Sequence, residues 1–150
     1  MPFRPKDERF EQRVRESFAI QKAVRTMGAT LERLAPGEVD IALPFRDDLT
    51  QQHGFLHAGV IATILDSACG FAAFTLMPAD AAVLSIEFKV NLLAPATGDR
   101  FIARGRVVRA GRTITVCQGD AFAVEKGAER HCASMTATMM TVLGRKGLKG

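Results

Sequence analysis

The sequence contains no tryptophan and no tyrosine, and only three of its 150 residues are cysteines. The missing aromatic types are residues that stack on bases, and the lysines and arginines are scattered among acids. The formal net charge of +4 would allow a nucleic-acid partner, but the scattered charges and the missing aromatics predict none. The same charge suits an anionic small molecule. Cys69, Cys117 and Cys132 lack metal-type spacing, which predicts reduced core thiols and no metal. The N-terminus also lacks the apolar core of a secretory signal, so we expect a cytoplasmic protein.

One long apolar stretch, Ala58 to Met77, contains a single charged residue, Asp66. About 20 apolar residues can span a bilayer. This stretch nevertheless includes Asp66 and several small residues, has no basic flanks and is followed by strand-like alternation, so it predicts a buried helix and no membrane association. A carboxylate in apolar surroundings is costly to desolvate unless it has partners. Asp66 is thus the residue that needs an explanation.

The remaining sequence predicts a short helical start and a series of strands within one folding unit. Apolar residues at helical spacing predict an amphipathic helix, continuous or broken, over residues 9–27. Residues 29–34 and 38–44 predict a hairpin, and residues 45–56 a polar loop. Further strands are expected over residues 84–92, 101–109, 113–124 and 130–142. A long helix combined with these strands predicts an α+β fold, in which a curved antiparallel sheet wraps around the helix.

The strand over residues 84–92 has a pronounced period of two. Its apolar residues alternate with polar ones, so one face is expected in the core. The apolar set is Leu84, Ile86, Phe88, Val90 and Leu92.

The segment from His53 to Gly70, followed by Ser85-Ile86-Glu87-Phe88 and Leu93-Ala94-Pro95-Ala96, resembles the hotdog-fold acyl-CoA thioesterases of the PaaI type. The resemblance covers residues 49–142. It implies a hotdog fold with a long central helix and, in this chain, an extra N-terminal helix. Residues 1–28 would form the N-terminal helical segment, residues 29–143 the thioesterase domain and residues 144–150 a basic tail.

The resemblance also implies roles for the two main site segments. His57-Ala58-Gly59 stands where the family has His-Gly-Gly, and the middle residue there offers its backbone N–H to the thioester carbonyl. Ala58 still has an N–H to offer. The catalytic carboxylate of the family falls nine residues after the histidine, on Asp66. Two simpler readings remain open: His57 could cap or pack at the helix start, and Asp66 could be satisfied by Thr63 or Ser67.

Further polar residues are candidates for contacts with substrate or water. A family Asn or Gln lies six residues before the histidine, which is Gln51 here, with Gln52 and His53 as neighbours that could substitute. Ser85 resembles a hydroxyl residue that assists in some members. An ordinary solvated loop is the alternative for the two glutamines.

Coenzyme A carries phosphates, and the turn containing Arg109 and Arg112 is a candidate site for them. A solvated hairpin tip is the alternative. No P-loop, dinucleotide fingerprint or metal motif is present, so we expect no bound cofactor beyond the CoA of the substrate.

The chemistry of thioester hydrolysis agrees with these residues. The start of a helix supplies unpaired N–H groups that can stabilise an oxyanion, and a carboxylate can activate water. Along one helix, however, Ala58 and Asp66 are about 12 Å apart. The resemblance implies that two subunits bring these groups together, so we expect a homodimer or a dimer of dimers.

The sequence therefore predicts a thioester hydrolase that acts on an aryl- or medium-chain acyl-CoA. Two alternatives remain: a hotdog hydratase or dehydratase, and a non-catalytic acyl-CoA-sensing domain. The segment before Ala29 is too short for a helix-turn-helix bundle, which disfavours a DNA-binding sensor.

Overall fold

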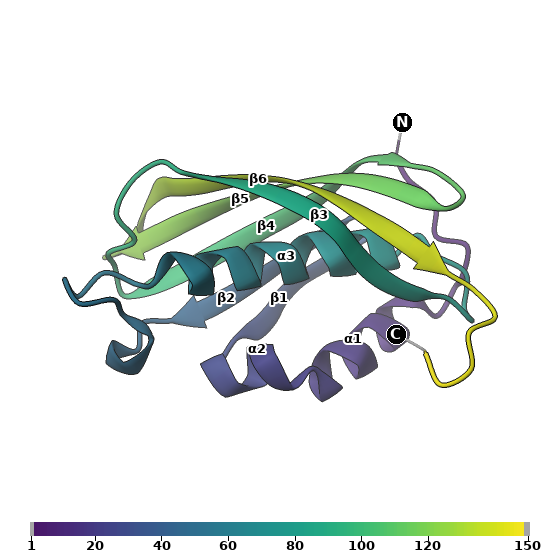
Figure 1. Ribbon diagram of the computed structural model, residues 1–150, viewed down its shortest axis with the longest axis horizontal. Coiled ribbons are helices and arrows are strands. Elements are labelled where there is room, and N and C mark those ends of the chain that lie inside the picture. The colour runs from purple at the N-terminus through teal and green to yellow at the C-terminus, as the bar shows by residue number, and fades with distance from the viewer. Residues whose placement is uncertain (1, 149–150) are drawn as a thin grey trace.

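The computed structural model describes residues 2–148. A curved, six-stranded antiparallel sheet of order β1-β2-β4-β5-β6-β3 wraps around the long helix α3 (Figure 1). The predicted α+β architecture is confirmed. The elements are α1 (Phe10–Ile20), α2 (Lys22–Met27), β1 (Thr30–Ala35), β2 (Glu38–Pro44), the 3-10 turn η1 (Asp47–Leu49), α3 (Ala58–Phe74), β3 (Ala82–Leu92), β4 (Arg100–Ala110), β5 (Ile114–Glu125) and β6 (Ala128–Val142).

A pair of glycines sets the distance between α3 and the sheet. Gly105 of β4 lies opposite Gly119 of β5. A Cβ added to Gly105 would stand 2.4 Å from the backbone of Ala68, and one added to Gly119 would stand 2.9 Å from the Cys69 sulfur. Any side chain at position 105 would therefore collide with helix backbone. This close approach holds the middle of α3, including the turn that carries Asp66, against the sheet.

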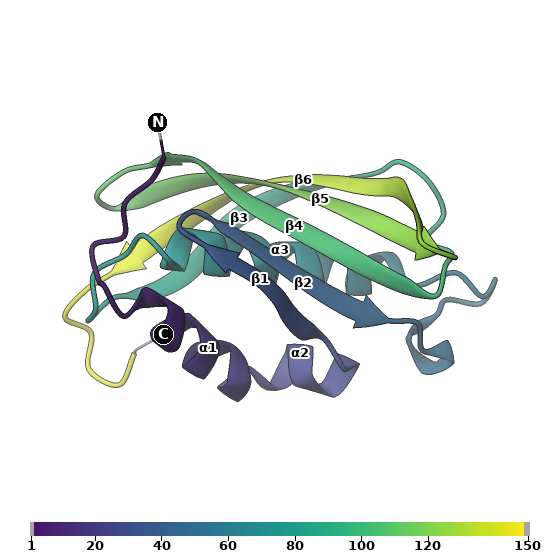
Figure 2. The same ribbon diagram turned by 180° about the vertical axis from the view of Figure 1, so that it is seen from behind.

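The N-terminal helices pack on the same core as α3. Val14 and Val24 are completely buried within the main hydrophobic cluster, and the helices lie along one side of α3 (Figure 2). The Arg13 guanidinium donates to the carbonyls of Phe74 (3.0 Å) and Met77 (2.9 Å). These are carbonyls at the C-terminal end of α3, where a cation is favoured. Gln21 has an extended backbone and interrupts the helical segment between α1 and α2.

The prediction of a regular strand over residues 84–92 was wrong in one respect. The register between β3 and β6 shifts between Ser85 and Glu87, which leaves Ile86 as a bulge. A bulge reverses the alternation of faces. Leu84 therefore lies on the opposite face from Phe88, and Ser85 turns toward α3, where it donates to Asp66.

The apolar residues of β3 are also less buried than a core strand requires. β3 is an edge strand of the sheet. Ile86 is 52% exposed and Leu92 is 57% exposed. The expected core face of this strand is thus only partly covered within one chain.

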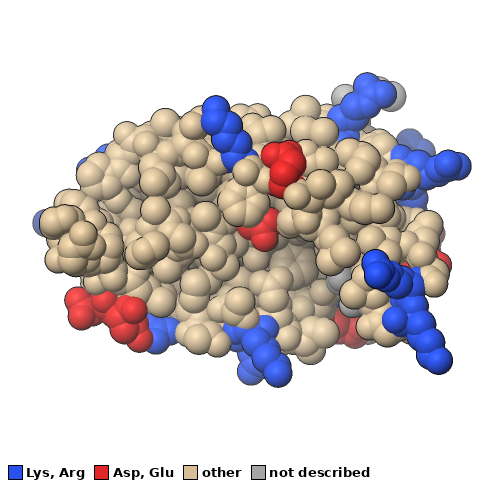
Figure 3. Space-filling model, in the orientation of Figure 1, with Lys and Arg blue, Asp and Glu red and all other residues tan. Residues whose placement is uncertain are grey.

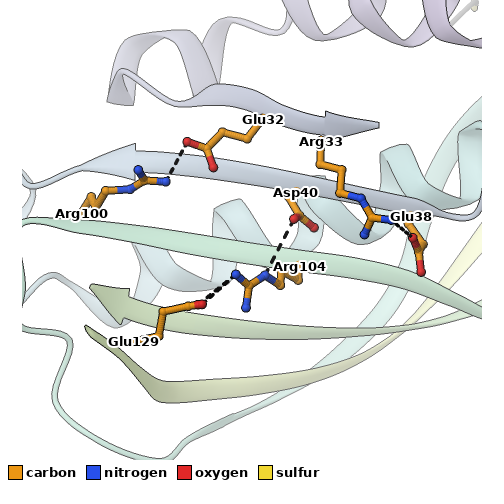
Figure 4. Close-up of polar contacts among 7 residues, drawn as sticks. All are labelled: Glu32, Arg33, Glu38, Asp40, Arg100, Arg104 and Glu129. Carbon is orange, nitrogen blue, oxygen red and sulfur yellow. Dashed lines mark hydrogen bonds and ion pairs between the residues drawn. The ribbon is translucent and has the colours of Figure 1, made fainter. Parts of the chain in front are cut away.

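The face of the sheet turned away from α3 carries paired charges. Gly105 faces the helix, so Arg104 beside it points outward. Arg104 contacts Glu129 at 2.7 Å and Asp40 at 3.8 Å, as Figure 4 shows. The same figure shows two further pairs, Arg33–Glu38 and Arg100–Glu32. Much of the basic charge on this face is consequently matched by acids on neighbouring strands.

The three cysteines are free and buried. Burial raises the pKa of Cys117 to about 12 and also raises the pKa of Cys69 and Cys132. Across residues 2–148, no cluster of three potential metal ligands is found, and no helix is both long and apolar enough to cross a membrane.

Candidate functional site

The start of α3 is built by His57 and Gly59. His57 is the N-cap residue, with extended backbone, and its Nδ1 accepts a 2.8 Å hydrogen bond from the Gly59 N–H. The capping role considered for His57 is therefore present. A Cβ at position 59 would lie 3.0 Å from Nδ1. Glycine at this position allows the imidazole to fold over the first turn.

Ala58 is the first residue of α3 and is exposed. Lys126 is the only non-glycine residue with positive φ between residues 2 and 148, so the backbone of Ala58 is ordinary for alanine. Within that range the Ala58 N–H donates no hydrogen bond, whereas the Gly59 N–H is occupied by His57. The replacement of the family glycine by alanine thus leaves an unpaired donor at the positive end of the helix dipole.

An apolar cavity of about 380 Å³ opens beside this donor. Its walls come from the loop before α3, the start of α3, the end of β3 with the loop that follows it, and β6. The lining residues are Gln51, Phe55, Leu56, Ala58, Ile61, Leu92, Leu93, Ala94, Pro95, Ala96 and Cys132. We call it the entrance cavity.

The turn before α3 places the side chains of Gln51, Gln52 and His53 in different surroundings. The Gln51 side-chain oxygen accepts from the backbone N–H of His53 (2.6 Å) and Phe55 (3.3 Å). Gln52 and His53 are exposed, and neither lines the entrance cavity. Of the three, only Gln51 is brought beside Ala58.

Asp66 lies on the exposed side of α3 and is partly buried. Its Oδ1 accepts a 2.7 Å hydrogen bond from the Ser85 hydroxyl of β3. The two partners considered from the sequence donate elsewhere: Thr63 to the Gly59 carbonyl and Ser67 to Gln21. The carboxylate is therefore oriented from the neighbouring strand, and the bulge in β3 makes this contact possible.

A second cavity, of about 250 Å³, surrounds Asp66. Its walls come from α3, β3 and α1 with the residue that follows α1, namely Ser17, Gln21, Asp66, Ser67, Gly70, Phe71, Val83, Leu84 and Ser85. We call it the carboxylate cavity. Sequence reasoning missed Ser17 and Gln21. In the sequence, both are polar residues within a predicted amphipathic helix. Such a position does not distinguish a cavity wall from a solvated helix face.

The two cavities share no lining residue. Eight residues of helical rise separate Ala58 from Asp66, about 12 Å. Within one chain, the unpaired donor and the oriented carboxylate therefore stand at different sites.

Arg109 is near the end of β4, Arg112 lies in the turn between β4 and β5, and both are exposed. Arg112 lines a cavity of about 370 Å³ with Leu76 and Met77, which follow the end of α3. The two arginines are therefore near the opposite end of α3 from Ala58, and their predicted contact with CoA stays a prediction.

Comparison with known proteins identifies relatives of this chain. A family model described as the thioesterase superfamily matches residues 53–129. The solved structure of a thioesterase family protein from Silicibacter pomeroyi is 54% identical, with a TM-score of 0.89 over 90% of this chain and 99% of that one. The predicted family and hotdog fold are confirmed by these matches.

Two sequence relatives carry functional names. A protein of Halobacterium salinarum named as an esterase is 35% identical over 61% of this chain, and the match spans 64% of the length of that relative. The medium/long-chain acyl-CoA thioesterase YigI of Escherichia coli is 28% identical, over 77% of this chain and 83% of its own length.

Proposed function

Because the chain belongs to the thioesterase superfamily, we propose that it hydrolyses an acyl-CoA thioester to the free acid and CoA. The observation that carries the proposal is that one helix, α3, presents both a free N–H at Ala58 and, at Asp66, a carboxylate oriented by Ser85. Thioester hydrolysis needs these two groups. An aryl or medium-chain acyl group suits the apolar entrance cavity of about 380 Å³.

In the proposed reaction, Asp66 removes a proton from water, and the resulting hydroxide attacks the thioester carbonyl carbon. The negative charge that develops on the carbonyl oxygen accepts a hydrogen bond from the Ala58 N–H. Collapse of the intermediate breaks the carbon–sulfur bond, and the departing thiolate takes the proton from Asp66. Water and thioester are thereby converted to acid and thiol, and no further cofactor is consumed.

Gln51 and His57 have supporting roles in this proposal. Gln51 lies beside Ala58 in the entrance cavity, where its amide N–H₂ can bind water or the carbonyl. His57 occupies the Gly59 N–H through its Nδ1. It thus shapes the oxyanion site.

A homodimer is part of the proposal because one chain separates the two groups. If the entrance cavity of one subunit meets the carboxylate cavity of the other, each interface forms two equivalent sites, as two-fold symmetry requires. Exposed apolar residues of the edge strand, such as Ile86 at 52% and Leu92 at 57%, support burial against a second copy. The face that contains α3 and β3 is also mostly uncharged, with acidic groups near its middle (Figure 3).

A free-thiol assay with a panel of aromatic and aliphatic acyl-CoAs tests the proposal. We expect release of CoA from at least one class and its loss in Asp66→Asn. If no panel member releases thiol above background, the hydrolase proposal fails and acyl-CoA sensing becomes the better explanation. Hydration of enoyl-CoA without thiol release would favour the hydratase instead.

A further inference from the structure

The carboxylate cavity is more polar than the binding of water alone requires. Besides Asp66 and Ser85, its walls carry Ser17, Gln21 and Ser67. Ser17 and Gln21 come from α1 and the residue after it, outside the segment from residue 53 to 129 that matches the family model. They are therefore features of this chain's N-terminal helical segment.

Gln21 is held at this cavity by structure on both sides. Arg13 fixes α1 to the end of α3 through two carbonyls, and Val24 of α2 is completely buried. The Gln21 side-chain oxygen accepts a 3.1 Å hydrogen bond from the Ser67 hydroxyl, one residue after Asp66. That bond occupies the oxygen. The amide N–H₂ donates no hydrogen bond to any of residues 2–148 and is available to a ligand.

The break between the helices does not need this side chain. The Gln21 N–H donates to the Phe18 carbonyl, and the Gln21 carbonyl accepts from the Arg25 N–H. The start of α2 has no side-chain cap. The Gln21 backbone groups are thus hydrogen-bonded to other backbone groups, so the break between the helices does not require the polar side chain.

We infer that Gln21 is a substrate-binding residue of the Asp66 site, and that its amide N–H₂ donates to a carbonyl or hydroxyl oxygen of the acyl-CoA. The inference rests on the proposed function and adds the N-terminal helical segment to the site. Two parts of the substrate offer such an oxygen: the pantetheine arm, through its amides or its hydroxyl, and a hydroxyl on the acyl group. Either oxygen would have to reach the carboxylate cavity, where the Gln21 amide lies.

Steady-state kinetics of Gln21→Leu test the inference. Leucine keeps similar bulk and removes the amide, so we expect KM to rise about 3- to 10-fold with kcat nearly unchanged, as loss of one uncharged hydrogen bond predicts. Ser67→Ala removes the hydrogen bond to Gln21 but keeps the amide, and should raise KM less. Gln12→Leu is the matched surface control, because Gln12 is exposed on α1 and donates to Glu16, and it should match the wild type.

The choice of substrate separates the two sources of the oxygen. Each acyl group is tested as its CoA ester and as the shortened N-acetylcysteamine thioester, with and without a hydroxyl. The KM effect can appear for every CoA ester and disappear in the shortened thioesters. This result places the oxygen on the distal pantetheine amide or hydroxyl. A KM effect that persists in every shortened thioester places the oxygen on the amide nearest the sulfur. An effect confined to hydroxylated acyl groups places it on the acyl group.

The inference is overturned if Gln21→Leu has the wild-type KM for all substrates, or if its only effect is a lower melting temperature. Both results are compatible with normal hydrolysis by the wild type. If the wild type releases no thiol from any substrate, the proposed function itself fails, so the two failures are distinguishable.

Discussion

In the proposed reaction, the start of α3 and its middle supply different groups. At the start, Ala58 offers an unpaired N–H beside an apolar cavity, and the imidazole of His57 covers the neighbouring donor. In the middle, Asp66 offers a carboxylate inside a polar cavity, and Ser85 orients it. One region can stabilise negative charge and the other can create a nucleophile.

Under the proposed mechanism, neither region is an active site by itself. A donor without a base cannot activate water, and a base without a donor cannot stabilise the oxyanion. The rigid helix between them fixes their separation at about 12 Å. Only a second copy of the chain can place the start of one α3 beside the middle of another.

The largest expected effect comes from removing the base. Asp66→Asn keeps the shape of the side chain and can still accept from Ser85, but the amide cannot take a proton from water. We expect kcat to fall about 10²- to 10⁴-fold with little change in KM. The matched control is Glu87→Gln, which alters an exposed carboxylate on β3 that accepts from Thr138. Wild-type turnover in Asp66→Asn would remove Asp66 from the chemistry.

The next largest effect comes from removing the donor. Ala58→Pro deletes the N–H at the first helical position, which proline tolerates, and the extended backbone of His57 (φ −60°, ψ 136°) is compatible with a following proline. The variant should fold and lose about 10²-fold in kcat. Retention of normal turnover by the folded variant would show that another group polarises the carbonyl.

Ala58→Gly is the matched control at the same position. It keeps the N–H, and the ordinary backbone of Ala58 gives glycine no strain to relieve. Turnover should stay near wild type, while the free energy of unfolding falls by about 0.4–1 kcal/mol through the unfolded chain. Increased stability would instead reveal strain at Ala58.

The proposed subunit contact can be disrupted by a substitution at a residue that lines neither cavity. Ile86→Asp places a charge on the bulge of the β3 edge, where the side chain is 52% exposed. We expect sedimentation to report a monomer and kcat/KM to fall by about 10-fold or more, because the two halves no longer meet. Val108→Asp is a matched control, since Val108 lies at a bulge in β4 and is 58% exposed. A fully active Ile86→Asp monomer would refute the shared site.

The smallest expected effect concerns the phosphates of CoA. Arg109 and Arg112 are exposed, and contacts of exposed charges are weak. Replacing both by alanine should raise KM for CoA esters about 2- to 5-fold at low salt. The rise should be absent for N-acetylcysteamine thioesters, which have no phosphate. An equal KM for CoA esters in variant and wild type would leave this turn as a solvated hairpin tip.

Local patterns predicted most of the fold, because they depend on residues close in sequence. Helical spacing and turn residues located the start of α3 and the strands within a few residues. The bulge at Ile86 could not be predicted in this way. Register is set by pairing with β6, and the alternating sequence is compatible with a straight strand as well as with a shifted one.

The separation of the two candidate groups could be predicted because a single helix carries both of them. The rise of a helix gives the separation of Ala58 from Asp66 directly. The loop before α3 was less informative, since turn geometry brings Gln51 to the cavity and leaves Gln52 and His53 in solvent. The bond between Ser67 and Gln21 joins residues 46 positions apart, and no local pattern encodes such a contact.

Activity of mixed dimers tests the shared site most directly. A chain carrying Asp66→Asn is mixed with a chain carrying Ala58→Pro after each has been shown to be folded and nearly inactive. Each mixed dimer contains one site with both groups intact and one site with neither. Random exchange at equal amounts should therefore restore about one quarter of wild-type turnover. A mixture that exchanges subunits but is no more active than its two components would contradict the account.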